Sequence, residues 1–554
     1  MYLTISHSQY KIYKNESVPL SSACFKPNAL SSLKSQKKKH LFQEIKPMKK
    51  SEFDRWSSET LQVVEIIANI YEKMFNLNFN KKGMDLVFSN WISYLIFHFK
   101  SMHFEYSFIK KKYNSLEVAP PINKYIKIPL TIKELRVFLQ NDHFNEIMFF
   151  YFVSENNFSF YDLSKIVKEN HHIKKKSFKN FLKSLLKRFH LIYSTFFSNI
   201  YPDNFVTSKL KDNYELMPDL DDFNFHYSKI DLDLRQKFYS ILKKKLKDIK
   251  NLEYNKISLL LSYFIPISMF EDILKIKKLS TSFNFRKNSI FYSKTAHYNN
   301  ELFKIKLAEE LKSNKLKLAI ICHGGGYHHP MWFDRDWERR FADYLIPHKK
   351  TNYKKYVSKF TKFKFTKSSN LFDEVLIVGT TFEIYRSGWF PVPDQWQMCQ
   401  KYADSIINLI TGLNSIYKSI YFRPHFNDYG WGLTEYLLSH HHNLKIIYPK
   451  EESLESNIKR FKTIINTADT TAMIKCFQNT NFNIGLIDPL YFDDNMNEII
   501  NRLYDCNIYF KNPNDLIKFL KNLSVNSLSN DELLNRKIAI SDYLQFMSDC
   551  QTKN

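Results

Sequence analysis

Glycine and cysteine are scarce in this chain, and long hydrophobic runs are absent. Its 554 residues include only ten glycines and six cysteines, and no two cysteines form a Cys-x-x-Cys pair. This spacing argues against a zinc site and against a disulfide framework, so a reducing compartment fits best. No apolar stretch reaches the roughly 18–20 residues of a membrane-spanning helix, and no signal peptide is expected. We expect a cytoplasmic protein, soluble or peripheral at the inner membrane.

The chain is strongly basic. Its 81 Lys and Arg residues outnumber 56 Asp and Glu residues, which gives a formal net charge of +25. Clustered basic side chains attract polyanions such as nucleic acids. Lys, Asn, Ile, Phe and Tyr are all overused, however, as in proteins of AT-rich genomes, so much of this charge reflects coding bias. The remaining attraction is to anionic surfaces, such as a membrane leaflet or a phosphorylated substrate.

The residue pattern differs between the first and second halves of the chain. Between residues 51 and 110, apolar side chains such as Leu61, Val64 and Ile67 recur at three- and four-residue spacing, which predicts amphipathic helices. After residue 285, short β-rich runs alternate with helical segments, and nine of the ten glycines follow residue 320. This alternation predicts parallel sheets, which bind ligands at the carboxyl ends of their strands. Strands are expected at 289–293, 316–322, 374–380, 419–425, 444–449, 463–469, 482–488 and 507–510.

The predicted fold class is α/β with two lobes, because the chain is longer than one hydrophobic core normally supports. Residues 1–50 are expected to form a basic, partly mobile arm. Residues 51–365 are expected to form a helix-rich N-terminal lobe, and residues 366–554 a Rossmann-like C-terminal lobe that ends in helices. The boundary between the lobes is expected between residues 345 and 373.

The first motif is a glycine-rich run after an apolar strand. His323 is followed by Gly324, Gly325, Gly326 and Tyr327. The glycines allow backbone N–H groups to point at an anion, and the histidine is a candidate base. One alternative is a strand-ending turn with a structural histidine. Another is the oxyanion hole of an esterase, which would need a downstream Gly-x-Ser-x-Gly elbow that the sequence lacks.

The second motif contains Arg423, His425 and Asp428 and follows another expected strand. A guanidinium beside His and Asp at a strand end suits a phosphate or carboxylate ligand, because it forms paired, charge-assisted hydrogen bonds. A surface salt bridge between Arg423 and Asp428 is the alternative.

The third motif, residues 466–471, includes Asp469, Thr470 and Thr471 and lies where an expected strand meets a helix. Hydroxyl groups at a helix N-terminus can bind a phosphate group together with the free N–H groups. Simple capping of the helix is the alternative.

No metal site is expected. His440, His441 and His442 have no accompanying acidic or cysteine ligands. Asp334 and Asp336 have the Asp-x-Asp spacing of some divalent-ion sites, but they stand at the start of an expected helix, where residues two apart do not share a face.

The three motifs, in this order, resemble those of a family of transferases from bacterial O-antigen and surface-polysaccharide regions, typified in spirochaetes. The resemblance includes the runs 85–91, 289–293 and 301–304. More distantly, the chain is similar to glycerophosphate and Kdo-type transferases, which have two Rossmann-like lobes in the GT-B arrangement.

This resemblance implies a glycosyltransferase-like enzyme that moves an activated sugar, or a sugar-like group, from a nucleotide donor onto a cell-surface polysaccharide or O-antigen precursor. The acceptor would be a glycan or a lipid-linked glycan on the N-terminal lobe, and the C-terminal lobe would bind the donor. His323 would lie near the reacting hydroxyl, while Arg423, His425, Thr470 and Thr471 would hold the donor phosphates. No cofactor is expected, and the reaction is expected to need no metal ion, because basic side chains would already face the donor phosphates.

Asp428 and Asp469 are then orienting groups rather than metal ligands, because neither belongs to an Asp-x-Asp pair. The competing function is a non-catalytic basic protein that binds anionic lipid or nucleic acid, which would need exposed basic stripes alternating with aromatic side chains. Glycines and hydroxyl groups at strand ends favour the transferase, so nucleic acid is not expected as a partner.

Overall fold

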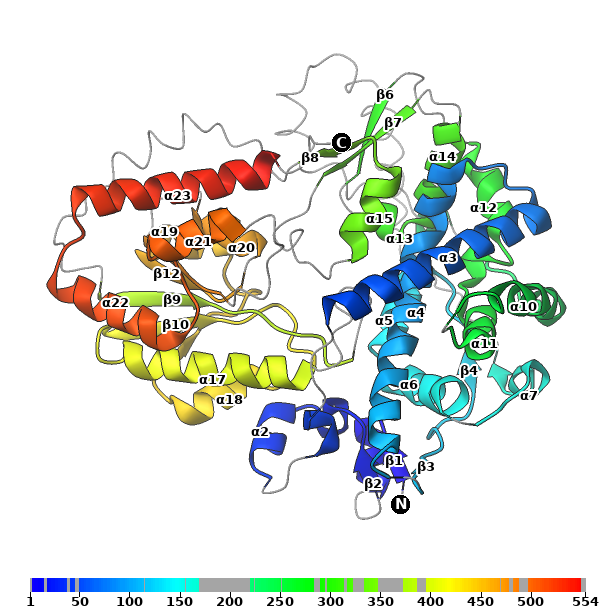
Figure 1. Cartoon of the computed structure of the whole chain (residues 1–554), viewed down its shortest axis with the longest axis horizontal. Coiled ribbons are helices and arrows are strands. Elements are labelled where there is room, and N and C mark those ends of the chain that lie inside the picture. Colours follow the sequence, from blue (N-terminus) through cyan, green and yellow to red (C-terminus); the bar gives the residue numbers. More distant parts are fainter. Residues whose placement is uncertain are drawn as a thin grey trace.

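The computed structural model of the chain consists of helices and parallel strands, which confirms the α/β class (Figure 1). Within the described residues, no helix is both long enough and apolar enough to cross a membrane. The structure describes residues 2–13, 17–36, 40–44, 49–113, 115–154, 156–168, 220–223, 225–250, 252–282, 289–293, 296–312, 316–321, 333–346, 372–385, 395–468, 470–477, 482–487 and 497–549.

The second half of the chain forms a six-stranded sheet in which every pair is parallel, with the order β11-β10-β9-β12-β13-β14. This confirms the predicted parallel sheet. Counted along the chain from β9 as the first strand, this order is 3-2-1-4-5-6, which is that of a doubly wound Rossmann sheet. The strands are β9 (Glu374–Val378), β10 (Ser419–Arg423), β11 (Lys445–Ile446), β12 (Thr463–Asn466), β13 (Phe482–Leu486) and β14 (Tyr509–Phe510).

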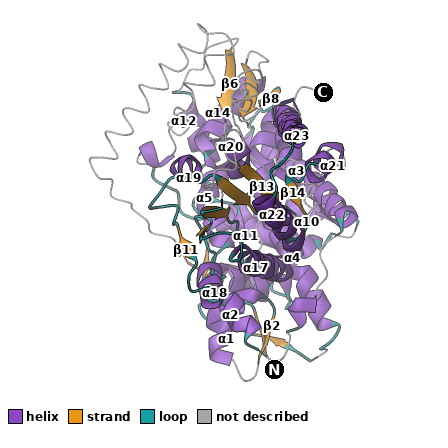
Figure 2. Cartoon of the chain, turned by 90° about the vertical axis from the view of Figure 1, so that its left-hand side faces the viewer, coloured by secondary structure: helices purple, strands orange, loops and turns teal. Residues whose placement is uncertain are grey.

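Both faces of this sheet are buried, because successive strand residues point to opposite sides. In β9, Val375 and Ile377 join the core under α17 and α22, whereas Leu376 and Val378 join a cluster with residues of α19 and α20. Figures 1 and 2 show these two helical layers around the sheet. The helices are α17 (Gln395–Leu413), α18 (Leu433–His440), α19 (Leu454–Arg460), α20 (Thr471–Phe477), α21 (Asn497–Asp505), α22 (Pro513–Val525) and α23 (Asn530–Asp549).

The first half is mainly helical and is built around α4, in which every residue from Asp85 to Met102 is buried. A helix buried on all sides must satisfy its polar groups internally. Accordingly, the ring nitrogen Nε2 of His98 lies 2.7 Å from Oδ1 of Asn145. The helices are α3 (Lys50–Phe75), α4 (Lys81–Lys110), α5 (Ile132–Leu139), α6 (Asp142–Met148), α7 (Phe160–Ser164), α10 (Leu232–Leu246), α11 (Tyr254–Phe264), α12 (Ile273–Ser280), α13 (Ala296–Asn299), α14 (Glu301–Lys312) and α15 (Phe333–Phe341).

Smaller parallel sheets accompany these helices. The predicted strands at 289–293 and 316–322 are present and pair in a sheet of order β6-β7-β8. Two further sheets have the orders β2-β1-β3 and β4-β5. Their strands are β1 (Tyr2–Thr4), β2 (Ser17–Pro19), β3 (Glu117–Val118), β4 (Ile126–Lys127), β5 (Val167–Lys168), β6 (Ser289–Ser293), β7 (Leu316–Ile321) and β8 (Tyr344–Ile346).

The described residues at the N-terminus are packed, whereas the sequence predicts a partly mobile arm. Leu3 and Ile5 lie in the main core, next to α1 (His7–Tyr13). Helix α2 (Ala29–Lys34) begins against the C-terminal half, because the N–H groups of Ala29 and Leu30 donate to backbone carbonyls at residues 430 and 431. Elements of three to seven residues are too short for a hydrophobic period to reveal them. The expected boundary near residue 365 lies outside the described residues.

Candidate functional site

The strand order changes direction between β9 and β12, which makes this the switch point of the large sheet. In open parallel sheets, ligands bind in the crevice outside the carboxyl ends of the strands at such a point. Residues 379–381 follow β9 there, and residues 467–470 follow β12. The switch point is therefore the first candidate site, and two of the three motifs follow strands at this edge.

A network of hydroxyl groups joins the two strand ends. Oγ1 of Thr467 donates to the carbonyl oxygen of Val378 at 2.8 Å and lies 2.7 Å from the hydroxyl of Tyr402 on α17. The Tyr402 hydroxyl in turn accepts from the N–H of Thr380 at 2.9 Å. Burial raises the pKa of Tyr402 to about 12, so its phenol stays protonated. Neither Tyr402 nor Thr380 was identified from sequence, because a tyrosine on an amphipathic helix is indistinguishable from a core residue.

Gly379 allows β9 and β10 to end close together. Its N–H donates to the carbonyl of Arg423 at 2.8 Å. A Cβ at this position would lie 2.5 Å from the ring of Phe422, a distance that real contacts do not reach. The backbone after β9 therefore packs directly against the ring of Phe422 on β10, with no room for a side chain at residue 379.

Arg423 is buried and holds the neighbouring helix α19. Its Nη1 donates to the carbonyl of Glu452 at 2.7 Å and to Oδ1 of Asn457 at 2.9 Å. Desolvation by burial lowers its pKa. The alternative interpretation, an ion pair with Asp428, is not formed. A role of Arg423 at the donor phosphates remains a prediction.

Asp428 shapes the loop that follows β10. Its carboxylate accepts hydrogen bonds from the N–H groups of Gly430, Gly432 and Leu433, at 3.1, 2.8 and 3.1 Å. Gly432 has a φ of 64°, and a Cβ there would lie 2.6 Å from Oδ1 of Asn28. The Asp428 carboxylate therefore stabilises a loop that packs against the N-terminal segment, so it orients the backbone of this loop.

The remaining motif residues are only partly described. His425 is exposed beyond β10, its Nδ1 accepts from the N–H of Asn427 at 3.2 Å, and desolvation lowers its pKa. Thr470 is half-buried before α20, so these two residues follow strands on either side of β9. Outside the described residues lie His323, Gly324, Gly325, Gly326, Tyr327, Asp469 and the side chains of Thr471, Asp334 and Asp336. The predicted convergence of all three motifs therefore stays a prediction.

A hollow of about 350 Å³ lies where the two halves of the molecule meet, beside α5. We call it the α5 hollow. Glu383 and Tyr429 enter it from the segments after β9 and β10, and the helical half supplies the other wall. Its lining residues are Tyr94, Lys133, Arg136, Val137, Leu139, Gln140, Asn299, Glu383 and Tyr429. No sequence pattern indicates this hollow, because only the fold brings α5 next to these loops.

Hydrogen bonds tie both walls of the α5 hollow together. Nη1 of Arg136 donates to Oδ1 of Asn299 at 3.0 Å. Nε2 of Gln140 donates across the two halves, to Oε2 of Glu383 at 3.3 Å and to the carbonyl of Tyr385 at 3.1 Å. The walls are therefore held in a fixed relation by polar contacts.

A buried polar network lies at the carboxyl end of β6. Oγ of Ser293 is 2.8 Å from Nδ1 of His297, and Nε2 of His297 is 2.8 Å from Oε1 of Glu338 on α15. The Tyr298 hydroxyl donates to the same carboxylate. Burial, and then the charge of Lys304, lowers the pKa of His297 well below its ordinary value, so the imidazole is neutral. All these side chains are fully enclosed, which indicates a role in fixing α15 against β6.

The described residues contain no group of three His, Cys, Asp or Glu side chains arranged to hold a metal ion. Two of the three consecutive histidines contact backbone carbonyls: Nδ1 of His440 lies 2.9 Å from the oxygen of Tyr436, and Nε2 of His441 lies 3.2 Å from that of Ile407.

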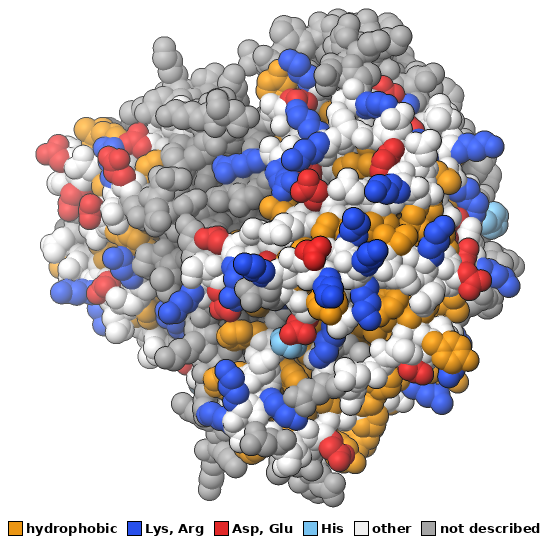
Figure 3. Space-filling model, turned by 45° about the vertical axis from the view of Figure 1, so that its right-hand side comes forward, with side chains coloured by type: hydrophobic (Ala, Val, Ile, Leu, Met, Phe, Trp, Pro, Cys, Tyr) orange, Lys and Arg blue, Asp and Glu red, His pale blue; other side chains and the backbone are white. Residues whose placement is uncertain are grey.

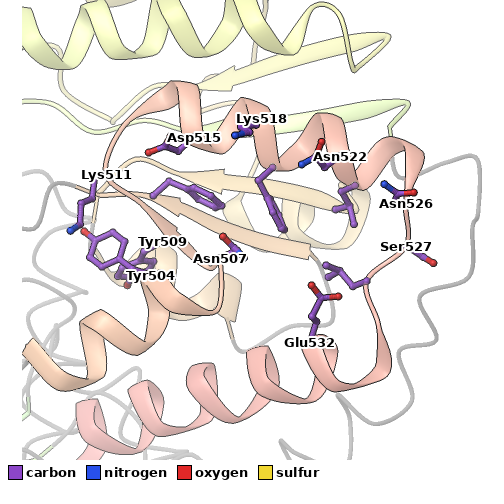
Figure 4. A pocket seen from close by; sticks show the side chains of 14 residues that line it. Tyr504, Asn507, Tyr509, Lys511, Asp515, Lys518, Asn522, Asn526, Ser527 and Glu532 are labelled. Carbon is purple, nitrogen blue, oxygen red and sulfur yellow. The ribbon is translucent and has the colours of Figure 1, made fainter.

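A larger hollow, of about 560 Å³, lies at the outer edge of the sheet between α22, β14 and the start of α23 (Figure 4). Its labelled side chains mix charges and amides, among them Lys511, Asp515 and Glu532. None of the three motifs contributes a residue to this hollow. It is the competing position for a ligand.

Comparison with known proteins gives one match. The model of a family described as "LIC12162 family transferase" matches residues 18–524. No curated protein and no solved structure matches the chain.

Proposed function

Because the chain belongs to the LIC12162 family of transferases and is thus an enzyme, we propose that it transfers an activated sugar from a nucleotide donor onto a glycan or lipid-linked glycan of the cell surface. The observation that carries this proposal is the doubly wound sheet, whose switch point is the position where such folds bind nucleotides. The proposed arrangement is GT-B-like, with the donor on the C-terminal half and the acceptor on the helical half.

In the proposed reaction, an acceptor hydroxyl attacks the anomeric carbon of the donor sugar. The bond between that carbon and the donor phosphate oxygen breaks, a new C–O bond forms, and the phosphate leaves with the nucleotide. His323 takes the proton from the hydroxyl. His425, Thr470 and Thr471 hold the phosphates, and Arg423 offsets the charge that develops there. The proposed reaction needs no metal ion and no cofactor.

The competing function, a basic protein that binds a polyanion without catalysis, would require a continuous basic surface. On the face drawn in Figure 3, the described Lys and Arg side chains are interspersed with Asp and Glu. This distribution favours a general attraction to anionic surfaces, such as the inner face of a membrane, rather than a nucleic-acid track.

A panel of nucleotides and nucleotide sugars tests the donor site. We expect at least one of them to raise the melting temperature, because a ligand at 100 times its Kd adds about 2.7 kcal/mol to the free energy of unfolding. In the variant Gly379→Val this stabilisation should be lost, since the added side chain would displace the ring of Phe422 at the switch point. Gly83→Ala, which crowds α4 against α14, is the matched control. Absence of a shift with every compound would contradict the proposal.

A further inference from the structure

The α5 hollow lies outside the proposed donor site, and among its lining residues only Tyr429 belongs to a loop that carries one of the three motifs. We propose that the hollow binds a sugar ring bearing an anionic group, either a carboxylate or a phosphate. This inference rests on the proposed function, in which it makes the hollow the acceptor subsite. It names a chemical class of acceptor, an acidic sugar.

Two basic side chains line one wall of the α5 hollow. Lys133 and Arg136 lie three residues apart on α5, a spacing that places them on one face of the helix. Both line the hollow, and Glu383 is the single acid among the lining residues. Glu383 already accepts a hydrogen bond from Gln140. The lining is thus net positive, and its two cations stand on the same wall.

The electrostatics of Tyr429 agree with a basic group on one wall of the hollow, Arg136, and an acidic group on the other, Glu383. Burial raises the pKa of the Tyr429 phenol and the nearby charge of Glu383 raises it further, while a hydrogen bond from Asn427 and the charge of Arg136 lower it. An acid and a base thus act on the same hydroxyl from opposite walls. A ligand between them would have an anion near Arg136 and a hydroxyl group near Glu383.

The rest of the lining suits a sugar ring. Tyr429 is half-buried and presents an aromatic ring and a hydroxyl group, which match the apolar face and polar rim of a sugar, whereas the buried ring of Tyr94 lies beneath the guanidinium of Arg136. Gln140 and Asn299 add amide groups for hydroxyl contacts. A volume of about 350 Å³ is at the small end of the range for ligand pockets, roughly 300–1,000 Å³, and favours one ring over a whole nucleotide.

The position of the hollow fits an acceptor. Glu383 and Tyr429 belong to the segments that follow β9 and β10, the strands next to the switch point. In Figure 1, α5 lies beside α4 on the side of the helical half that faces the sheet. A ring held against α5 would therefore lie on the side of a nucleotide bound at the switch point that faces the helical half.

Saturation-transfer NMR with glucose, glucuronate and glucose 6-phosphate on the full chain tests this inference. We expect at least one of the two anionic sugars to bind about tenfold more tightly than glucose, which is the size of one charge-assisted hydrogen bond. Preference for glucuronate would identify the anion as a carboxylate, and preference for glucose 6-phosphate would identify it as a phosphate. Equal binding of all three sugars, or no binding, would overturn the inference.

Variants locate the binding. Lys133 and Val137 are exposed on the rim, Val137 by 63%, so changes there leave folding intact. Lys133→Met and Val137→Glu should each remove the preference for the anionic sugar, since one deletes a cation and the other adds an acid. Lys244→Met, which removes an exposed charge on α10 outside the hollow, should keep it. A preference that survives in Val137→Glu would also overturn the inference, whereas the nucleotide panel reports separately on the donor site.

Discussion

Replacement of His323 by alanine is expected to reduce turnover by about 10²–10⁴ while leaving nucleotide affinity nearly unchanged. Strand β7 ends at Ile321, in the middle of its three-stranded parallel sheet, so His323 follows the carboxyl end of that strand by two residues. A neutral imidazole near pH 7 can accept the proton of an attacking hydroxyl. The measurement is the initial rate with the stabilising nucleotide sugar and its acceptor.

His323→Gln is the matched variant, because it keeps a polar side chain of similar length but cannot act as a base. It should lose as much activity as His323→Ala. Another histidine, His297, is fully enclosed and already bonded to Ser293 and Glu338, so it is not the expected base. Full activity of His323→Ala on an authentic donor and acceptor would show that the glycine run is only a turn.

Glu301 is expected to make the folded state less stable as the pH rises from 4.5 to 7. Glu301 is the first residue of α14, and its carboxyl group is buried. Its Oε1 accepts hydrogen bonds from the N–H of Ile132 at 2.6 Å and from Oγ of Ser268 at 3.2 Å. Burial raises its pKa from 4.5 to about 7, although these bonds and the charge of Lys304 oppose the shift.

The direction of this change in stability with pH follows from proton binding. Between pH 4.5 and 7 the folded protein holds a proton on Glu301 that the unfolded chain has released, so unfolding becomes easier as the pH rises. The stabilisation is complete below pH 4.5 and is lost above 7, a total of about 3 kcal/mol at about 1.4 kcal/mol per pKa unit. Glu301→Gln mimics the neutral form and lacks this dependence.

Denaturant unfolding at pH 4.5 and pH 8 gives the comparison. Glu301→Gln should gain about 3 kcal/mol relative to the unsubstituted protein over this range, whereas Glu117→Gln, at an exposed strand position, should not. A constant difference between Glu301→Gln and the parent protein at both pH values would show that folding does not raise the pKa of Glu301.

The sequence predicted the large sheet well, because buried parallel strands are read as short apolar runs between helices. Strands β9, β10, β12 and β13 lie inside their predicted ranges, with ends a few residues shorter. The packed N-terminal segment could not be predicted, because its elements are short and its contacts are with residues 430 and 431, four hundred positions along the chain.

The site was predicted only in part, since sequence shows residue types at strand ends but not their partners. Arg423 stands at the end of β10 as expected, yet its Nη1 is bonded to α19. Asp428 accepts hydrogen bonds from the backbone of its own loop, and its role beside the donor stays a prediction. The α5 hollow combines residues from five parts of the chain, whose proximity no local pattern encodes.

Hydrogen–deuterium exchange with the nucleotide that stabilises the protein is the most direct measure of where the donor binds. The proposed site predicts slower exchange in peptides that contain residues 379–383 and 466–477, because a bound phosphate would order the ends of β9 and β12. Peptides from residues 504–532, which line the hollow at β14, should exchange as before. Protection confined to residues 504–532 would place the nucleotide at the outer edge of the sheet and contradict the account.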